Sequence, residues 1–277
     1  MDSDLRSQRG GLRGFSIHRL IPNVLTLAAL CSGLTGIRFA LQGEMRLAVI
    51  AIIVAAIFDA LDGRVARRLG VTSRFGAELD SLSDFLCFGV APALVLYLAS
   101  LSHVGALGWI VTLMFPICSA LRLARFNTAL VSDTPPPVWT GSYFTGVPAP
   151  AGALLALMPL MVSFEIEAAW PRHSVVVGLV LVAVGGLMVS RVPTFSFKKG
   201  RIPRHLVLPT LLAAALVMGV LASAPWIALS LIGLGYMCLI PFSLLSYRRQ
   251  AAQDRKAAEA AGVVPLRAVD RGSPSGD

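Results

Sequence analysis

Charged residues are scarce in this chain. They make up 14% of its 277 residues, whereas hydrophobic residues make up 56%, and soluble globular proteins carry about 25% charged residues. Acidic residues are the scarcest, with 15 Asp and Glu against 24 Lys and Arg and a net charge of +9. A soluble or disordered protein is therefore nearly excluded. The basic residues lie between apolar stretches, which indicates contact with lipid headgroups or phosphates rather than with nucleic acid.

Side chains that would bind zinc are also few. Each of the four cysteines lies inside an apolar run, and the four histidines are scattered along the chain. None of them forms a pair at the spacing that is typical of metal ligands. We therefore interpret the cysteines as packing residues and expect no zinc site.

What the sequence does contain is a series of long apolar runs. A run of about 20 residues can cross a bilayer as a helix, and no alternating pattern suggests a barrel. The sequence predicts an all-α, polytopic membrane bundle of about eight transmembrane helices, at roughly 22–42, 46–68, 77–101, 104–126, 147–164, 173–190, 206–223 and 225–247.

Lys and Arg are unevenly distributed between the two ends of these spans. With the N-terminus in the cytoplasm, 21 of the 24 fall on the cytoplasmic side, and only Arg38, Arg46 and Arg172 fall on the other. This asymmetry predicts that both termini are cytoplasmic. Residues 1–21 form either an interfacial helix or a disordered basic tail, residues 22–247 a membrane catalytic domain, and residues 248–277 a basic flexible tail.

Four carboxylates interrupt the second and third spans. Asp59 and Asp62 are three residues apart, and Asp80 and Asp84 are four apart, so each pair shares one helix face. The two antiparallel helices bring the pairs to a similar depth. Carboxylates at membrane depth mark function, and four that face one another cannot all stay ionised without counter-charges. Two divalent ions, Mg²⁺ or Mn²⁺, would resolve the repulsion.

Small and polar residues lie beside these carboxylates. Gly63 and Ala66 leave a hollow, Arg67 stands one turn above it, and Ser73 lies in the following loop. This combination suits a pyrophosphate. The alternative is a carboxylate–arginine network that only ties the helices together.

The pattern D-x2-D-G-x2-A-R-x8-G-x3-D-x3-D runs without exception from Asp59 to Asp84. It resembles the signature of the CDP-alcohol phosphatidyltransferases. That resemblance implies an integral membrane enzyme with a core of six helical spans, usually a homodimer. Such an enzyme moves a phosphatidyl group from a CDP-linked donor to an alcohol and releases CMP.

The resemblance also assigns roles to residues. It implies that Asp59, Asp62 and Asp80 ligate the metals, and that Asp84 completes the second metal site and acts as the catalytic base. The residues implied to contact the CDP-linked donor are those of the hollow and of an element at the start of the first span: Gly63, Ala66, Arg67, Ser73, Pro22, Asn23, Val24, Leu25 and Thr26. Without the acidic motif, this last element would equally indicate an ordinary helix start.

The acceptor alcohol is less well marked. Arg122 and Arg125 share a face near the cytoplasmic end of the fourth span, followed by Asn127. They could bind a carboxylate or a phosphate, or serve as interfacial anchors. Four segments resemble the phosphatidylserine-forming members of the family, which join CDP-diacylglycerol and L-serine. These segments are 79–92, 121–127, 144–151 and 190–199. The proline-rich stretch 132–139 matches no shared motif, and the last two spans look like lipid-facing additions.

Other interpretations stay open at this stage. The same family contains enzymes with other acceptors, such as glycerol 3-phosphate, inositol phosphate or choline. A divalent-cation transporter would also use four aspartates, but transporters tend to repeat broken helices at the midplane. A lipid-binding scaffold has no need of these aspartates, and Gly63, Ala66 and Arg67 argue against a prenyl-diphosphate transferase. The expected location is a bacterial-type inner membrane, among membrane lipids.

Overall fold

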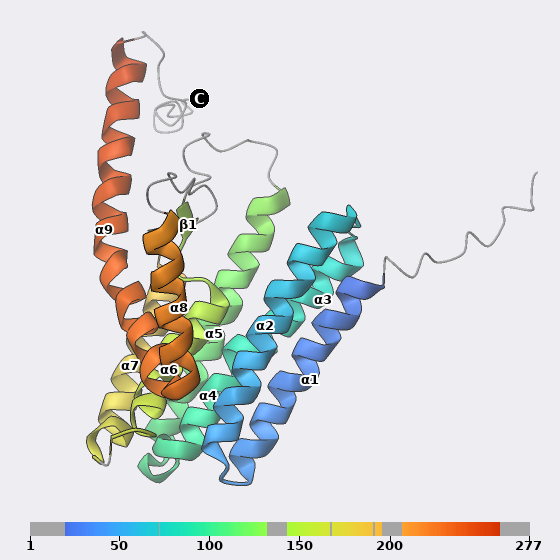
Figure 1. Ribbon diagram of the computed structural model, residues 1–277, viewed down its shortest axis with the longest axis vertical. Helices are drawn as coiled ribbons and strands as arrows, with labels where there is room; N and C mark the ends of the chain where they lie inside the picture. Colours follow the sequence, from blue (N-terminus) through green and yellow to red (C-terminus); the bar gives the residue numbers. More distant parts are fainter. Residues whose placement is uncertain are drawn as a thin grey trace, which may run out of the picture.

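A computed structural model describes residues 20–71, 73–131, 143–166, 168–190, 192–195 and 207–260. Helices occupy all eight predicted positions (Figure 1). The bounds of the main helices are α1 Ile21–Leu41, α2 Met45–Leu69, α3 Arg74–Asp84, α4 Ala91–Leu96, α5 Ala106–Val131, α6 Ala149–Val162, α7 Ser174–Val189, α8 Val207–Ser223 and α9 Pro225–Ala260. The basic segment before residue 20 and the proline-rich stretch lie outside the described residues.

The third predicted span is one continuous rod that begins with α3. Two π-helical segments, Phe85–Val90 and Tyr97–Leu101, flank α4, and a 3₁₀ turn over Ser102–Val104 ends the rod. The first π-helical segment begins directly after Asp84. Such wide turns are rare and are frequent at functional sites.

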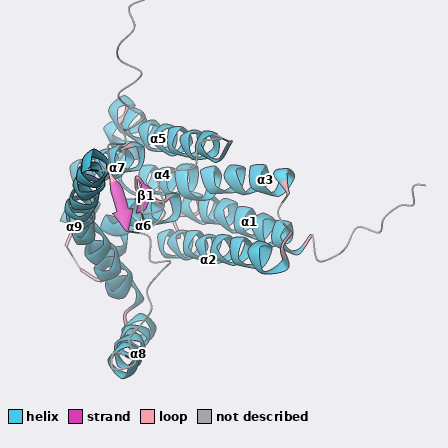
Figure 2. Ribbon diagram, turned by 90° about the horizontal axis from the view of Figure 1, so that it is seen from above, coloured by secondary structure: helices cyan, strands magenta, loops and turns pink. Residues whose placement is uncertain are grey.

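Small residues let α1 approach its neighbours closely. A Cβ at Gly33 would lie 2.6 Å from Cys87 Sγ, and one at Gly36 would lie 3.1 Å from the carbonyl oxygen of Ala48 in α2. Small residues at helix contacts are the usual means of close packing inside membranes. This packing fixes α1, α2 and the α3 rod side by side, as seen from above in Figure 2.

The later helices complete the bundle. Two short antiparallel strands, β1 Tyr143–Thr145 and β2 Pro193–Phe195, pair before α6 and after α7. Arg46 at the start of α2 donates a hydrogen bond of 2.9 Å to the carbonyl of Phe164, just beyond the end of α6. In Figure 2, α8 stands apart from the bundle. α9 continues to Ala260, so the segment expected to be flexible from residue 248 begins as helix.

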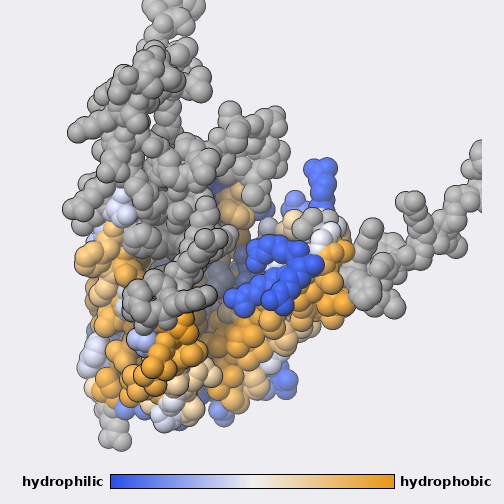
Figure 3. All heavy atoms as spheres, turned by 45° about the horizontal axis from the view of Figure 1, so that its top comes forward, coloured by the Kyte–Doolittle hydropathy of each residue, from blue (hydrophilic) through white to orange (hydrophobic). Residues whose placement is uncertain are grey.

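The surface is that of a membrane protein. Four stretches of the described chain are long and apolar enough to cross a bilayer, namely Ile21–Leu41, Arg74–Val104, Ala106–Thr128 and Pro225–Ser243. Three shorter apolar helices accompany them: α6, α7 and α8. Figure 3 shows apolar residues along the visible sides and hydrophilic residues gathered at the end that carries the α2–α3 connection. The prediction of a helical membrane bundle is confirmed, with the short β1–β2 pair as its one addition among the described residues. The number of crossings remains a prediction.

Candidate active site

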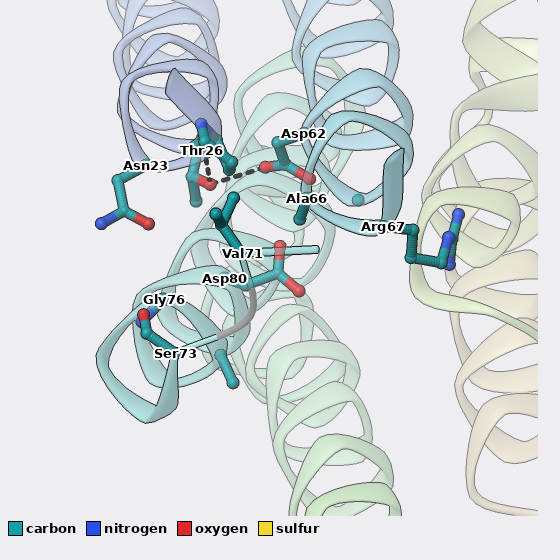
Figure 4. Close-up of a pocket in the computed structure, with 12 residues that line it drawn as sticks. Asn23, Thr26, Asp62, Ala66, Arg67, Val71, Ser73, Gly76 and Asp80 are labelled. Carbon is teal, nitrogen blue, oxygen red and sulfur yellow. Dashed lines mark hydrogen bonds between the residues drawn. The ribbon is translucent and has the colours of Figure 1, made fainter. Parts of the chain in front are cut away.

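A cavity of about 490 Å³ opens where α1, α2 and α3 meet at this hydrophilic end. Nearly every wall residue comes from the start of α1, the end of α2 or the start of α3 (Figure 4). The lining residues are Pro22, Asn23, Thr26, Asp62, Gly63, Ala66, Arg67, Val71, Ser73, Gly76, Ala77 and Asp80. The hollow that the small residues of the motif predict is therefore present.

Asp62 and Asp80 line this cavity, and Asp59 clusters with them although it is not one of the lining residues. Asp59, Asp62 and Asp80 each offer an oxygen within 4.8 Å of the others. Their positions follow from the sequence, because residues three apart on α2 share a face and α3 packs antiparallel beside it. Such closely spaced like charges repel one another. A set of carboxylate oxygens of this kind suits a hard divalent cation.

Asp84 completes the cluster from the end of α3. Its carboxylate contacts that of Asp59, and its Oδ1 is buried with no hydrogen-bond partner among the described residues. A buried carboxylate oxygen without a partner is costly. The observation fits a site in which a cation and a substrate hydroxyl would satisfy this oxygen.

Asp62 is held in place by α1. It is 5% exposed, and its Oδ2 accepts a hydrogen bond of 2.6 Å from the Thr26 hydroxyl (Figure 4). Thr26 is itself 4% exposed and also reaches the carbonyl of Pro22 at 3.1 Å. Groups that hydrogen-bond to a ligating carboxylate orient it toward its metal. Thr26 therefore positions Asp62 as well as lining the cavity.

The first turn of α3 forms another wall of the cavity. Ser73 is the N-cap residue, and its hydroxyl accepts a hydrogen bond of 3.0 Å from the backbone N–H of Gly76. A Cβ at Gly76 would lie 3.0 Å from Asn23 Oδ1, so only glycine lets α1 approach this turn without a shift. The positive end of the α3 dipole consequently faces the cavity, which favours an anionic group there.

Arg67 lies across the cavity from Asn23, with the carboxylates of Asp62 and Asp80 between them in the view of Figure 4. It is an exposed residue in the last turn of α2. Gly70, with φ of +63°, ends that helix in the left-handed conformation that glycine favours. The cavity thus combines acidic residues that could hold a cation with a basic residue that could bind a phosphate.

The structure separates the two arginines that the sequence groups together. Arg122 is half-buried on α5 and lies within electrostatic reach of Asp84. Arg125 is exposed, and its Nη1 donates a hydrogen bond of 2.6 Å to the carbonyl of Val189, the last residue of α7. Arg122 is thus the arginine placed beside the carboxylate cluster.

Asn127 is bound to α3. Its Nδ2 donates a hydrogen bond of 3.1 Å to the hydroxyl of Ser81, which follows Asp80 in the chain. This bond ties the end of α5 to the helix that carries two of the four aspartates. The observed contact of Asn127 is therefore one that holds helices together.

Two residues of the predicted donor-binding set lie away from the cavity. Val24 and Leu25 do not line it, and Val24 is 60% exposed. The cause is helical geometry, because positions 22, 23 and 26 share one side of α1 and positions 24 and 25 turn to other sides. Conversely, Val71 and Ala77 line the cavity without having been predicted. Ala77 lies one turn after Ser73, a spacing that could have identified it.

Known proteins with similar sequences indicate the family of this chain. The family model described as CDP-alcohol phosphatidyltransferase matches residues 19–190, and a second, described as CDP-alcohol phosphatidyltransferase 2, matches residues 205–241. The chain is 39% identical over 234 residues to CDP-diacylglycerol–serine O-phosphatidyltransferase of Mycobacterium leprae, covering 84% of this chain and 77% of that one. Identity to the protein of the same name from Mycobacterium tuberculosis is 38% over 238 residues, covering 86% and 82%. For the Helicobacter pylori protein of that name it is 34% over 180 residues, covering 65% and 73%.

Proposed function

Since the chain belongs to the CDP-alcohol phosphatidyltransferase family, we propose that it is an integral membrane enzyme that transfers the phosphatidyl group of CDP-diacylglycerol to L-serine. The products are phosphatidylserine and CMP. The observation that carries this proposal is the cluster of Asp59, Asp62 and Asp80, two of which line a cavity that also has Arg67 in its wall. The relatives from Mycobacterium leprae and Mycobacterium tuberculosis, which align with more than four-fifths of the chain, are named for serine as the acceptor, and this supports serine here.

The donor would bind with its CDP group in the cavity. Asn23, Thr26, Gly63, Ala66 and Ser73 supply small and polar surfaces, and Arg67 would pair with the pyrophosphate. Val24 and Leu25 would contact the surrounding lipid instead. Because the cavity opens beside apolar helix surfaces, the acyl chains could stay in the bilayer.

Asp59, Asp62, Asp80 and Asp84 would hold two divalent ions, Mg²⁺ or Mn²⁺. When bound, such ions neutralise pyrophosphate charge and polarise the phosphorus. The residues of the chain then perform the remaining steps. Asp84 takes the proton of the serine hydroxyl, whose oxygen forms a bond to the phosphorus that carries diacylglycerol. The bond from this phosphorus to the CMP oxygen breaks, and Arg67 stabilises the charge on the departing CMP.

Arg122 would bind the carboxylate of serine. It lies within electrostatic reach of Asp84, where the acceptor hydroxyl must arrive, and a guanidinium matches a carboxylate in charge and shape. A free carboxylate is what distinguishes serine from ethanolamine. Arg125 and Asn127, which the sequence places in the same site, already bind Val189 and Ser81 and would support it from outside.

The proposal includes a membrane arrangement. Eight spans with both termini in the cytoplasm place the cavity at the cytoplasmic face of a bacterial inner membrane. The charge asymmetry supports this orientation. The family resemblance supports a homodimer.

A headgroup screen tests the function. Purified protein would receive CDP-diacylglycerol and one alcohol at a time, namely L-serine, glycerol 3-phosphate, inositol phosphate or choline, with CMP release as the readout. We expect release with serine only. Asp80→Asn should abolish it, whereas Glu165→Gln, an equal change outside the cavity, should not. If glycerol 3-phosphate stimulated CMP release and serine did not, glycerol 3-phosphate would replace serine as the proposed acceptor.

A further inference from the structure

A second cavity lies between the end of α6 and the start of α9. Its volume is about 490 Å³, and its walls are mostly apolar, with Met158 and Val162 from α6 and Leu234 from α9 among them. Ligand sites are typically apolar cavities of this size, with a few polar groups that fix the orientation of the ligand. The polar side chains in this wall are Glu165 and Ser230. The cavity therefore suits an amphiphile.

This second cavity belongs to the end of the bundle opposite the carboxylate cluster. Arg46, at the start of α2, donates its hydrogen bond of 2.9 Å to the carbonyl of Phe164, the residue before Glu165. Asp62 lies much further along the same helix, about 24 Å away at the helical rise. Since the hydrocarbon core of a bilayer is about 30 Å thick, the second cavity lies near the other face of the membrane. It is separate from the candidate active site.

Aromatic and charged side chains border the mouth of the second cavity. The rings of Phe164 and Trp226 pack edge-on with centroids 4.9 Å apart, and the guanidinium of Arg46 lies 5.6 Å from the Phe164 ring centre. Trp226 lines the cavity, and tryptophan is enriched where a bilayer meets water. Glu165, an exposed residue, lines it as well. One positive and one negative side chain thus border the same end of α6.

Ser230 offers a hydrogen-bond donor deeper in the second cavity. It lies one turn after Trp226 on α9, and its Oγ is buried without a hydrogen-bond partner among the described residues. A helical serine commonly donates to a carbonyl of the preceding turn, as Ser223 does to Gly219 at 2.8 Å. A buried hydroxyl without a partner is costly. A ligand with an acceptor at this depth, such as the ester carbonyl of a glycerolipid, would satisfy it.

We propose that the second cavity binds a phospholipid whose headgroup carries an ammonium group. An acyl chain lies between the apolar walls of α6 and α9, and Ser230 donates to the ester carbonyl. At the mouth, Arg46 pairs with the phosphate and Glu165 with the ammonium group. A lipid of the phosphatidylethanolamine type carries both charges, whereas phosphatidylglycerol leaves the carboxylate without a counter-charge. The inference does not depend on the proposed reaction.

Fluorescence quenching of Trp226 tests this contact. The full-length protein has four tryptophans, and Trp109→Phe, Trp139→Phe and Trp170→Phe together leave only Trp226. The bilayers are phosphatidylglycerol with a minor fraction of a lipid with brominated chains, which quench tryptophan on contact. We expect brominated phosphatidylethanolamine to quench about two- to fivefold more than brominated phosphatidylglycerol, the range of an exposed ion pair. A variant that keeps only Trp109, which is 41% exposed on α5, reports the bulk lipid and should show no preference.

A charge variant tests the recognition of the headgroup. In the protein that keeps only Trp226, Glu165→Gln should remove the preference for phosphatidylethanolamine. Glu44→Gln is the matched control, because Glu44 is an exposed carboxylate at the start of α2, at the same end of the bundle, and does not line the second cavity. A preference that survives Glu165→Gln, or that Glu44→Gln removes equally, would refute the assignment.

The unsubstituted protein provides a second measurement. In detergent, a lipid that binds the folded protein raises its thermal midpoint. Short-chain phosphatidylethanolamine should raise the midpoint more than short-chain phosphatidylglycerol, and Glu165→Gln should remove the difference. Equal effects of the two lipids on both the midpoint and Trp226 would overturn the inference. Absence of quenching by either lipid would also overturn it, because another helix or a second copy of the chain would then cover the cavity. Neither readout uses CMP release, so failure of the proposed function would be seen separately.

Discussion

We predict that Thr26, an uncharged residue, controls the metal dependence of CMP release through its hydrogen bond to Asp62. Thr26→Val keeps the branched shape but removes the hydroxyl that donates at 2.6 Å to Asp62 Oδ2. The hydroxyl has one proton, and its contact with Pro22 is longer, at 3.1 Å, so the carboxylate is the stronger partner. A hydrogen bond to a charged group contributes about 1.5–3 kcal/mol. Loss of such support typically weakens metal affinity about 10- to 100-fold.

The assay is CMP release as a function of Mg²⁺ or Mn²⁺ concentration, with both substrates saturating. We expect Thr26→Val to raise the half-activating concentration at least about tenfold, and Thr26→Ser to restore it. Thr35→Val is the matched control, since Thr35 lies on the same helix and only back-bonds to the carbonyl of Cys31 at 2.7 Å. Equal half-activating concentrations in Thr26→Val and Thr35→Val would refute the reasoning.

Two further predictions follow from other contacts, and a third follows from the charge asymmetry. Gly76→Ala places a methyl group about 3.0 Å from Asn23 Oδ1 and should raise the KM for CDP-diacylglycerol several-fold without changing that for serine; an unchanged donor KM would contradict the proposed donor site. Arg125→Ala removes the hydrogen bond to the Val189 carbonyl and should lower the thermal midpoint by about 2–4 °C, and a raised serine KM at constant midpoint would instead give it an acceptor role. A single cysteine at Ser3 should resist an impermeant thiol reagent outside sealed cells, and labelling would reverse the proposed orientation.

The carboxylate cluster was predictable from sequence because its geometry is local. Asp59 and Asp62 share a helix face by spacing alone, and the short connection to α3 forces the next acidic pair to lie opposite. The same argument places Gly63 and Ala66 in the wall of the cavity. It also explains why only some of the consecutive residues in the predicted donor-binding element line the cavity. A helix turns Val24 away from a cavity that Asn23 lines.

Contacts between helices that are distant in sequence were not predictable in the same way. Thr26 and Asp62 are 36 residues apart, and nothing in either segment identifies the other as its partner. Arg122 and Arg125 share a helix face, yet one approaches Asp84 and the other binds the end of α7. Long flexible side chains follow the partners that tertiary packing supplies. Spacing could indicate a basic pair but not that its two side chains have different neighbours.

The last two helices show why apolar composition alone understates function. The sequence of 206–247 contains no charged residue, so its spans look like lipid-facing additions. α8 fits that interpretation, because its described side chains are almost all exposed. α9 differs because one of its sides is buried against the bundle. Apolar composition therefore identifies both segments as membrane helices but does not show which of them packs into the fold. That distinction depends on which side of each helix meets its neighbours, and in the described residues it is α9 that presents a buried side.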